Sequence, residues 1–504
     1  MINFRNPKTI CLKSEEKWKL SNGEVSLIDE EIYLQTNCAS WVKIEWEADF
    51  SSYSLVLGDA WERTYGDVCW KPIFEPTFHP WYFSVKDGDV ISCIGVKTAP
   101  SALCSWTVSE RTVTLLMDVR CGCLDTQFEG RKIKLAELVY LTEQGDTFNI
   151  INKFCRKMCD KPALPKTAFY GGNDWYDCYG NNSYESILNH SKLLSECSAG
   201  LKNRPYLTID TGWQKFFNWY SKDFYIGGPF SECNAKFGDM KKLADEIHAM
   251  GVKPGIWYRP LQTIEYMPDD AFLRRDNINQ KILDPSHPMV IEKTQEDVRR
   301  FIDWGYELIK QDFSTYDVFG HYAPEMTQSV VEGDWSFYNR SKTSAEIFKE
   351  YYILMKNASG QALINACETF SHLSAGVFDI YRIGDDTSGL EHHTTIKMGV
   401  NTVAVRGVQH NAFYSADPDC VAITDKITWE QSKQWLEFLK YSGLPLNVSV
   451  QKECYTKDVR EAITEAFAIA SEPHDVAKPI DWYDTKTPTR WLTFDGEKEF
   501  IWKY

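Results

Sequence analysis

The sequence predicts an α/β protein in which a (β/α)8 TIM barrel follows an N-terminal β-sandwich and precedes a short C-terminal β appendage. Three observations support this fold. Residues 1–150 are rich in short runs of β-branched and aromatic residues. From residue 163 to residue 470, short apolar runs alternate with amphipathic helical segments, as in a barrel of strand–helix units. Residues 471–504 place Trp482, Trp491 and Trp502 at strand-like spacing.

The N-terminal strands are predicted where β-forming runs are interrupted by Gly, Asp or Pro. The clearest of these runs are Trp41–Trp46, Ser54–Leu57, Tyr82–Val85 and Thr112–Met117. No strong helical period appears before the region Ile151–Cys159. An antiparallel sandwich is therefore the expected form of residues 1–150.

The barrel prediction rests on eight apolar runs, seven of which lead into a predicted helix. The runs are Thr167–Gly171, Tyr206–Ile209, Val252–Tyr258, the stretch Tyr306–Ser314, Ala362–Ala366, Val377–Ile383, Ala412–Tyr414 and Leu444–Val450. The helices are expected near Tyr184–Glu196, Asp239–Met250, Thr294–Trp304, Thr343–Asn357, Thr394–Gln409, Trp429–Tyr441 and Asp458–Ala470. The link between the fifth and sixth strands is too short for a full helix. A doubly wound open sheet is the alternative, but no G-x-G-x-x-G follows any of the strands.

Composition excludes several classes of function. The chain of 504 residues has a net charge of −16, which argues against nucleic acid or an anionic membrane as its main partner. It shows no signal-peptide core and no run apolar enough to span a bilayer, so a cytoplasmic location is expected. Its 15 cysteines are scattered and are expected to be free thiols, and no metal or cofactor is predicted. A homo-oligomer is left open.

The ends of the predicted strands carry polar and aromatic residues. In the stretch Tyr306–Ser314, Lys310 and Asp312 are two residues apart, so both point to one side of the strand. In an α/β barrel, reactive groups lie at the carboxyl ends of the strands. The set to be gathered there is Trp175, Asp210, Trp257, Lys310, Asp312, Glu368, Arg382, Asp386 and Asp419. Several carboxylates with tryptophans and two cations are typical of a glycoside hydrolase pocket. Taken one at a time, each residue is better explained as a cap or a salt bridge, but for the whole set that explanation requires a coincidence at seven strand ends.

Seven short motifs in order resemble the melibiase-type α-galactosidase superfamily of retaining glycosidases. They are G-G-N-D-W (Gly171–Trp175), I-D-T-G-W (Ile209–Trp213), K-P-G-I-W (Lys253–Trp257), L-I-K-Q-D (Leu308–Asp312), A-C-E (Ala366–Glu368), Y-R-I-G-D-D (Tyr381–Asp386) and A-D-P-D (Ala416–Asp419). The resemblance covers roughly residues 165–450. It implies a hydrolase that cleaves terminal α-galactoside-like residues of a carbohydrate substrate.

The resemblance also implies roles for the matching residues. Asp312 would be the nucleophile, and Asp386, rather than Asp385, the acid/base. Lys310 is expected to keep Asp312 ionised, whereas Asp386 needs a raised pKa. The matching Glu and Arg bind the sugar 2-hydroxyl, and the matching Lys binds the 3- and 4-hydroxyls. The substrate-binding set is Trp175, Asp210, Trp213, Trp257, Lys310, Glu368, Arg382 and Asp419.

Three positions depart from the pattern of the superfamily. Thr211 stands where the second Asp of D-D-G-W holds the galactose 4- and 6-hydroxyls, and a neutral hydroxyl is a weaker acceptor than a carboxylate. Gly172 and Cys420 replace a Trp and a Met, and both changes are expected to reshape the pocket. The alternatives are therefore a β-L-arabinopyranosidase or another variant sugar specificity, or a sugar-binding barrel without activity. Hydrolysis and sugar transfer are both open.

Overall fold

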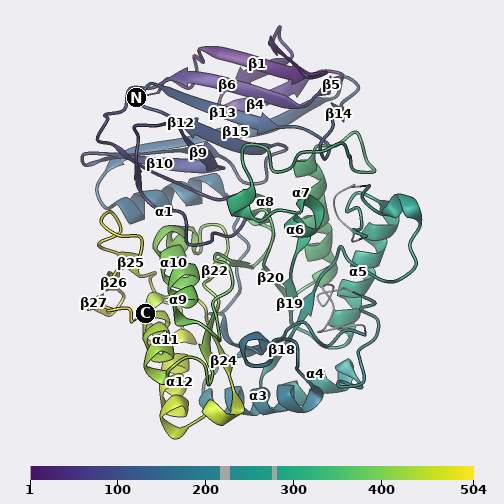
Figure 1. Ribbon diagram of the computed structural model, residues 1–504, viewed down its shortest axis with the longest axis vertical. Helices are drawn as coiled ribbons and strands as arrows, with labels where there is room; N and C mark the ends of the chain where they lie inside the picture. Colours follow the sequence, from purple (N-terminus) through teal and green to yellow (C-terminus); the bar gives the residue numbers. More distant parts are fainter. Residues whose placement is uncertain (1, 216–227, 275–280, 504) are drawn as a thin grey trace.

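The computed structural model describes residues 2–215, 228–274 and 281–503, and its N-terminal part contains two main antiparallel sheets (Figure 1). The first runs in the order β2 (Lys17–Leu20), β1 (Thr9–Ser14), β6 (Trp41–Glu47), β13 (Thr112–Asp118), β12 (Leu103–Val108) and β9 (Thr77–Pro80). The second runs in the order β3 (Val25–Ile28), β4 (Glu31–Gln35), β15 (Lys132–Gln144), β11 (Val90–Val96), β10 (Tyr82–Asp87), β7 (Leu55–Gly58) and β8 (Lys71–Pro72). A small pair joins β5 (Cys38–Ala39) to β14 (Thr126–Gln127).

Apolar and polar residues alternate along the strands of these sheets, and the apolar ones form the buried face. In β6, Val42, Ile44 and Trp46 are buried, whereas the intervening Lys43 and Glu45 are partly exposed. Side chains of the two sheets meet where Phe83 of β10 contacts Trp106 of β12 edge-on, with ring centroids 5.6 Å apart. Each of the four strands predicted in this region overlaps an observed one, so those predictions are confirmed.

A parallel sheet forms the second part of the molecule. Its order is β22 (Ser415–Asp417), β21 (Ile380–Arg382), β20 (Leu363–Ala366), β19 (Leu308–Gln311), β18 (Lys253–Tyr258), β17 (Tyr206–Ile209), β16 (Tyr170–Asn173), β24 (Leu446–Val450) and β23 (Cys420–Ile423). All adjacent pairs in this order are parallel. β22 and β23 lie at opposite ends of the order, although only Pro418 and Asp419 separate them in the chain.

Helices follow most of these strands and cover the sheet (Figure 1). They are α2 (Trp175–Cys178), α3 (Tyr184–Cys197), α4 (Met240–Ala249), α5 (Pro288–Asp303), α6 (Ser314–Phe319), α7 (Ser344–Ser359), α8 (Ser371–Ser374), α9 (His392–Thr395), α10 (Asn401–Arg406), α11 (Trp429–Ser442) and α12 (Lys457–Ala470). A further helix, α1 (Thr147–Met158), precedes the parallel sheet and packs on β11 and β15 of the N-terminal part. Side-chain caps fix where they start: Ser183, Thr343 and Thr428 each accept a hydrogen bond from the backbone N–H three residues later. Among the described residues, no helix is both long and apolar enough to cross a bilayer.

Two of the predicted strands are misplaced. Ala412–Tyr414 forms a turn, in which the Asn411 N–H donates to the Tyr414 carbonyl, and the strand begins only at Ser415. The run is apolar because the Tyr414 ring stacks on Tyr381, with centroids 4.5 Å apart. The predicted strand Thr167–Gly171 overlaps the observed β16, which begins three residues later and ends two residues later. A short apolar run indicates burial, and burial is compatible with a strand or with a packed turn.

The C-terminal residues form a small antiparallel sheet of β25 (Lys478–Pro479), β26 (Arg490–Thr493) and β27 (Gly496–Glu499). Trp491 and Trp502 are buried, and both donate their indole N–H to the Pro488 carbonyl, at 3.0 and 2.8 Å. The Trp491 ring also packs edge-on against Phe438 of α11, at 4.7 Å. The tryptophans therefore fix this sheet to the helix layer.

Candidate active site

A cavity of about 500 Å³ lies at the carboxyl ends of β19, β20 and β21. Its walls come from these strand ends and from two loops, one of them in the N-terminal part of the chain. The lining residues are Arg63, Tyr65, Asp312, Phe313, Tyr322, Pro324, Glu325, Glu368, Asp385 and Asp386. Three residues predicted from separate strand ends, Asp312, Glu368 and Asp386, therefore face one cavity.

Asp312 directly follows β19 and is only 7% exposed. Its Oδ2 accepts a hydrogen bond from the indole N–H of Trp257 at 2.9 Å. Its Oδ1 accepts one from the Phe313 backbone N–H at 3.0 Å. Trp257 lies on the adjacent strand β18, so the parallel pairing of β18 and β19 sets the direction of the carboxylate. Both oxygens of the Asp312 carboxyl group are therefore held by N–H donors.

Lys310 has a different main partner from the one expected. Its ammonium group is 2.6 Å from Oδ2 of Asp210, which also accepts from the Asn173 amide at 2.9 Å. Burial alone would lower the pKa of the Lys310 amine, but Asp210 opposes this and raises that pKa well above its ordinary value. The short ion pair therefore joins Lys310 to Asp210, and Asp312 contributes to its charge balance as a weaker neighbour.

Arg382 connects two of the predicted acids. Its Nη2 lies 2.9 Å from Oδ2 of Asp419 and 3.1 Å from Oδ1 of Asp386. Asp419 is held in turn by the Tyr176 hydroxyl and by the Thr387 backbone N–H, which donates at 2.8 Å. Arg382 and Asp419 are both buried, so their contact is made out of water, where charge interactions are strong, whereas the Asp386 side chain is 45% exposed.

The adjacent carboxyls of Asp385 and Asp386 have opposite pKa shifts. Burial by itself raises the pKa of Asp386, but the positive charges of Arg382, Arg63 and Lys310 outweigh burial and lower that pKa below its ordinary value. Burial raises the pKa of Asp385, and the neighbouring Asp386 adds to this effect against the attraction of Arg63. The raised pKa that the sequence argument required of Asp386 is therefore found on Asp385 instead.

Arg63 is a member of this site that the sequence analysis missed. It belongs to the N-terminal part, yet its Nη2 is 2.6 Å from Oε1 of Glu368 and 2.7 Å from Oδ1 of Asp385. Its Nη1 is 3.7 Å from Oδ1 of Asp386. The loop is held by Thr64, whose N–H donates to the Ile383 carbonyl and whose carbonyl accepts from the Asp385 N–H, both at 2.9 Å. No motif surrounds Arg63 in the sequence, and only its proximity to the strand ends reveals it.

Most of the other predicted binding residues are buried and are not among the residues that line the cavity. Asp210, Trp257, Lys310, Arg382 and Asp419 are buried and joined to one another or to the lining carboxylates by the contacts above. Trp175 is 9% exposed and packs in a cluster with Tyr176, Cys420 and Ala422.

The structure places Trp213 away from the cavity. Its side chain is fully buried beside Phe301 and Trp304, and its indole N–H donates to the Trp257 carbonyl at 3.1 Å. A tryptophan that follows a predicted strand can thus be a core residue as readily as a binding residue.

The three residues that depart from the superfamily pattern lie in different surroundings. Thr211 is buried, and its hydroxyl accepts a hydrogen bond from the Gln214 amide at 2.9 Å. Cys420 packs in the cluster that contains Trp175. Gly172 does not face the cavity, because a Cβ there would lie 2.9 Å from the Val448 carbonyl oxygen and 3.3 Å from Leu194 of α3. The expectation that Gly172 reshapes the pocket is therefore wrong; a glycine is needed there because the helix layer approaches closely.

Two buried polar atoms in this site have no hydrogen-bond partner among the described residues: Glu368 Oε2 and Arg382 Nε. Glu368 lines the cavity, whereas Arg382 is not among its lining residues and contacts the lining Asp386. Buried polar groups in native proteins are normally satisfied, so unpaired ones beside a cavity favour a ligand that pairs with them. One is an acceptor and the other a donor, which suits a hydroxyl group. No group of three or more His, Cys, Asp or Glu in the described part of the chain is arranged to hold a metal ion.

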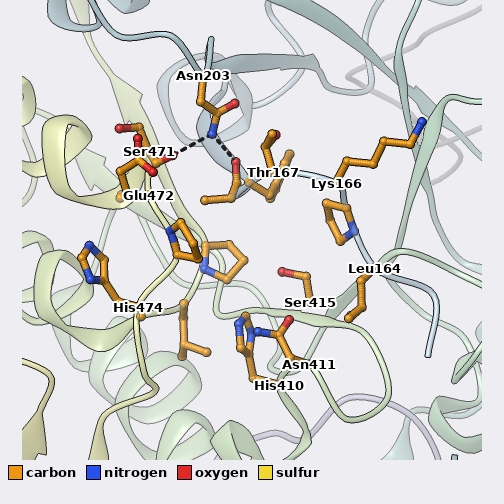
Figure 2. Close-up of a pocket in the computed structure, with 18 of the residues that line it drawn as sticks. Leu164, Lys166, Thr167, Asn203, His410, Asn411, Ser415, Ser471, Glu472 and His474 are labelled. Carbon is orange, nitrogen blue, oxygen red and sulfur yellow. Dashed lines mark hydrogen bonds between the residues drawn. The ribbon is translucent and has the colours of Figure 1, made fainter. Parts of the chain in front are cut away.

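A larger cavity of about 730 Å³ lies at the opposite, amino ends of the strands (Figure 2). Figure 2 shows Lys166, Thr167, Asn203, His410 and Glu472 around it. The Asn203 amide donates to the Ala168 and Ser471 carbonyls at 2.8 and 2.9 Å. Glu472 is the single acid among its described lining residues, so this cavity lacks the pair of carboxylates that glycoside cleavage needs.

Comparison with solved structures identifies the fold. The chain is similar to TtGalA, an α-galactosidase of Thermus thermophilus solved with p-nitrophenyl α-D-galactopyranoside, at 14% identity and a TM-score of 0.64, covering 98% of this chain and 99% of that one. It is also similar to the GH36 α-galactosidase AgaA of Geobacillus stearothermophilus, at 12% identity and a TM-score of 0.61, covering 97% and 77% of the two chains. An α-galactosidase of Lactobacillus brevis matches at 13% identity and a TM-score of 0.61, covering 93% and 66%.

No protein-family model matches the sequence, and no curated protein matches it. Identities of this size establish a shared fold and leave the activity to be argued from the site. The resemblance drawn from seven short motifs is thus confirmed at the level of the fold: the chain has the fold of the GH36 α-galactosidases.

Proposed function

We propose that this protein is a retaining exo-glycoside hydrolase that cleaves terminal α-galactoside-like residues, with Asp312 as nucleophile and Asp386 as acid/base. The observation that carries the proposal is that both carboxylates line one cavity at the carboxyl ends of parallel strands. The unpaired Glu368 Oε2 and Arg382 Nε beside it support a hydroxyl-bearing ligand. The fold shared with α-galactosidases gives the sugar class.

The architecture that we propose with it is a closed (β/α)8 barrel at residues 163–470, between a β-sandwich at 1–150 and a β appendage at 471–504. Support for closure comes from β22 and β23, which pair with β21 and β24 at the two ends of the sheet order while only two residues separate them in the chain. In this interpretation they are the two halves of one barrel strand, interrupted at Pro418 and Asp419.

The proposed reaction is a double displacement. The Asp312 carboxylate attacks the anomeric carbon and forms an ester, while the bond from that carbon to the leaving oxygen breaks and Asp386 gives its proton to that oxygen. In the second half, Asp386 removes a proton from water, the water oxygen bonds to the anomeric carbon, and the Asp312 carboxylate is released. The two N–H donors to Asp312 suit a group that must begin and end as an anion.

The remaining residues are proposed to hold the sugar hydroxyls. Glu368 and Arg382 carry an unpaired acceptor and an unpaired donor, and they suit the 2-hydroxyl. The Lys310–Asp210 pair suits the 3- and 4-hydroxyls, because each charge can bind an added hydroxyl without losing its partner.

A second candidate is a β-L-arabinopyranosidase, whose sugar is α-galactose without the CH2OH group. The observation that favours it is Thr211, which is buried and already accepts from Gln214, so it offers no carboxylate to a 6-hydroxyl. Equal or faster turnover of the aryl α-galactoside than of the arabinoside would exclude this candidate.

The experiment that tests the proposal measures release of p-nitrophenol from four aryl glycosides: the α-galactoside, the α-N-acetylgalactosaminide, the β-L-arabinopyranoside and the α-glucoside. Wild type is assayed beside Asp312→Ala. Activity on one substrate that the variant loses, and that azide restores with formation of a glycosyl azide, supports Asp312 as nucleophile. No activity on any of the four contradicts the proposal, and sugar-binding measurements then test a barrel that binds sugar without cleaving it.

A further inference from the structure

Three aromatic side chains line one part of the catalytic cavity and have no role in the proposed reaction. They are Tyr65, Phe313 and Tyr322, and each is partly exposed. Tyr65 belongs to the N-terminal loop that carries Arg63, whereas Phe313 and Tyr322 follow β19. We call these three side chains the aromatic wall.

One face of Tyr322 is covered by another ring. Tyr316 of α6 stacks on it with ring centroids 4.5 Å apart and an interplanar angle of 21°. Tyr316 does not line the cavity, whereas Tyr322 does. The face of Tyr322 that is turned away from Tyr316 is therefore the one available to a ligand.

Phe313 is supported in a similar way. The Arg259 guanidinium lies 4.2 Å from the centroid of its ring, and Asp317 fixes that guanidinium with two hydrogen bonds of 2.5 and 3.1 Å. Arg259 is 4% exposed, so it is held inside the protein behind the ring. Both rings are thus rigid before a ligand arrives, which lowers the entropic cost of binding.

The backbone at Phe313 is strained in a way that couples this ring to the nucleophile. Its φ of 61° is left-handed, a conformation that is unfavourable for a residue with a Cβ. Such strain is found mainly at functional sites. Phe313 directly follows Asp312, and its N–H donates to Oδ1 of Asp312. The same backbone turn therefore directs the carboxylate and the aromatic ring.

Tyr65 completes the wall beside Tyr322, with centroids 5.9 Å apart. Its hydroxyl is already engaged, because it donates to Glu62 at 2.9 Å and accepts from Arg63 Nε at 3.2 Å. Tyr65 can therefore offer its ring rather than a hydrogen bond. The acids around the wall outnumber the cations: among the described residues the cavity is lined by five acids and by one cation, Arg63, which is paired with three of them.

From this arrangement we infer that the aromatic wall binds the leaving group, and that this group is an uncharged ring with a flat apolar face, either a pyranose or an aryl ring. Aromatic side chains attract such faces through dispersion and edge–face contacts. The excess of acids disfavours a phosphate or carboxylate on the leaving group. The inference rests on the proposed function, because it names the group released by Asp312 and Asp386.

The test compares a glycoside whose leaving group reaches the wall with one whose leaving group is a single atom. p-Nitrophenyl α-galactoside and raffinose serve as the first kind, and α-galactosyl fluoride as the second. We expect Tyr322→Leu to lower kcat/KM for the ring-bearing substrates about tenfold more than for the fluoride. Tyr322→Phe keeps the ring and should keep the wild-type ratio. Tyr53→Leu is the matched control, because Tyr53 is 90% exposed and lies outside the cavity.

The outcomes separate this inference from the function on which it rests. If wild type cleaves neither the fluoride nor the ring-bearing substrates, the proposed function fails and the inference fails with it. If wild type cleaves both kinds and Tyr322→Leu lowers both by the same factor, the function stands and the wall is not a leaving-group site. If galactose 1-phosphate, which carries an anionic leaving group, is cleaved as fast as the aryl galactoside, the preference for an uncharged group is wrong.

Discussion

The cavities at the two ends of the parallel sheet differ in size and in the use of charge. The amino-end cavity is the larger, at about 730 Å³ against about 500 Å³. Two of its lysines have partners: Lys440 contacts Glu437 and Glu465, and Lys166 donates to Gln361. The carboxyl-end cavity has adjacent carboxyls with shifted pKa values and buried polar atoms without partners. Cavity volume therefore does not single out the proposed active site, whereas buried charge with incomplete pairing does.

The largest expected difference in kcat is between variants of one acid in the carboxyl-end cavity and one acid in the amino-end cavity. Asp312→Asn should lower kcat by about 10⁴-fold or more, because removal of a nucleophile removes the covalent path. Glu472→Gln removes the single acid among the described lining residues of the amino-end cavity and should leave kcat within about twofold. Steady-state kinetics on the best aryl glycoside measures both. Comparable losses in the two variants would contradict the assignment of the active site to the carboxyl end.

The second-largest expected effect shows which of the adjacent aspartates, Asp385 or Asp386, is the acid/base. Asp386→Ala should lower kcat about 10²–10⁴-fold for a sugar leaving group that needs a proton. The loss should be much smaller for a fluoride leaving group, which departs without general-acid help. Asp385→Ala should show no such dependence on the leaving group. The reverse pattern would make Asp385, the carboxyl with the raised pKa, the acid/base.

A smaller effect concerns Arg63 and pH. Arg63, with Arg382 and Lys310, lowers the pKa of Asp386 against the effect of burial. A general acid must be protonated, so removing one of these charges raises that pKa and extends activity to higher pH. Arg63→Met should move the alkaline limb of kcat/KM upward by about one pH unit, and Arg63→Lys should leave it close to wild type. A limb that moves down, or does not move, in Arg63→Met contradicts this electrostatic role.

The smallest effect on the reaction, and a measurable one on stability, is expected at the amino end. Burial, reinforced by Arg156, lowers the pKa of His410 from 6.5 to about 4. Between these values the unfolded chain binds a proton that the folded one does not, so His410 costs stability as pH falls from 6.5 toward 4 and has no such effect above 6.5. The cost at low pH is up to about 3 kcal/mol.

The variant that tests this is His410→Asn, which can still accept the hydrogen bond that His410 Nδ1 takes from the Ala416 N–H at 3.1 Å. Urea unfolding at pH 8 and pH 4.5 should show the variant gaining stability relative to wild type only at the lower pH. Its kcat at neutral pH should be unchanged, because His410 lies at the other end of the sheet from the reaction. A gain that is equal at both pH values would contradict the titration of His410.

Much of this architecture follows from local sequence. The strand Tyr206–Ile209 is observed with the predicted bounds, and the helix predicted at Asp239–Met250 is observed as α4, capped by the Asp239 side chain. Apolar runs, helix-capping residues and glycines at helix ends act on residues that are close in the sequence. They can therefore be recognised from a single sequence. The predicted gathering of Asp312, Glu368 and Asp386 also follows, because parallel strands place their carboxyl ends at one edge.

What the tertiary structure alone decided is how the charged groups pair. Lys310 and Asp312 are two residues apart, yet the short ion pair of Lys310 is with Asp210, which directly follows β17. Arg63 reaches Glu368 and Asp385 from the N-terminal part because Thr64 bridges to Gly384. Periodicity reports which side of an element is buried, whereas an ion pair depends on distances of a few ångströms between distant segments, and those distances are set only when the chain packs.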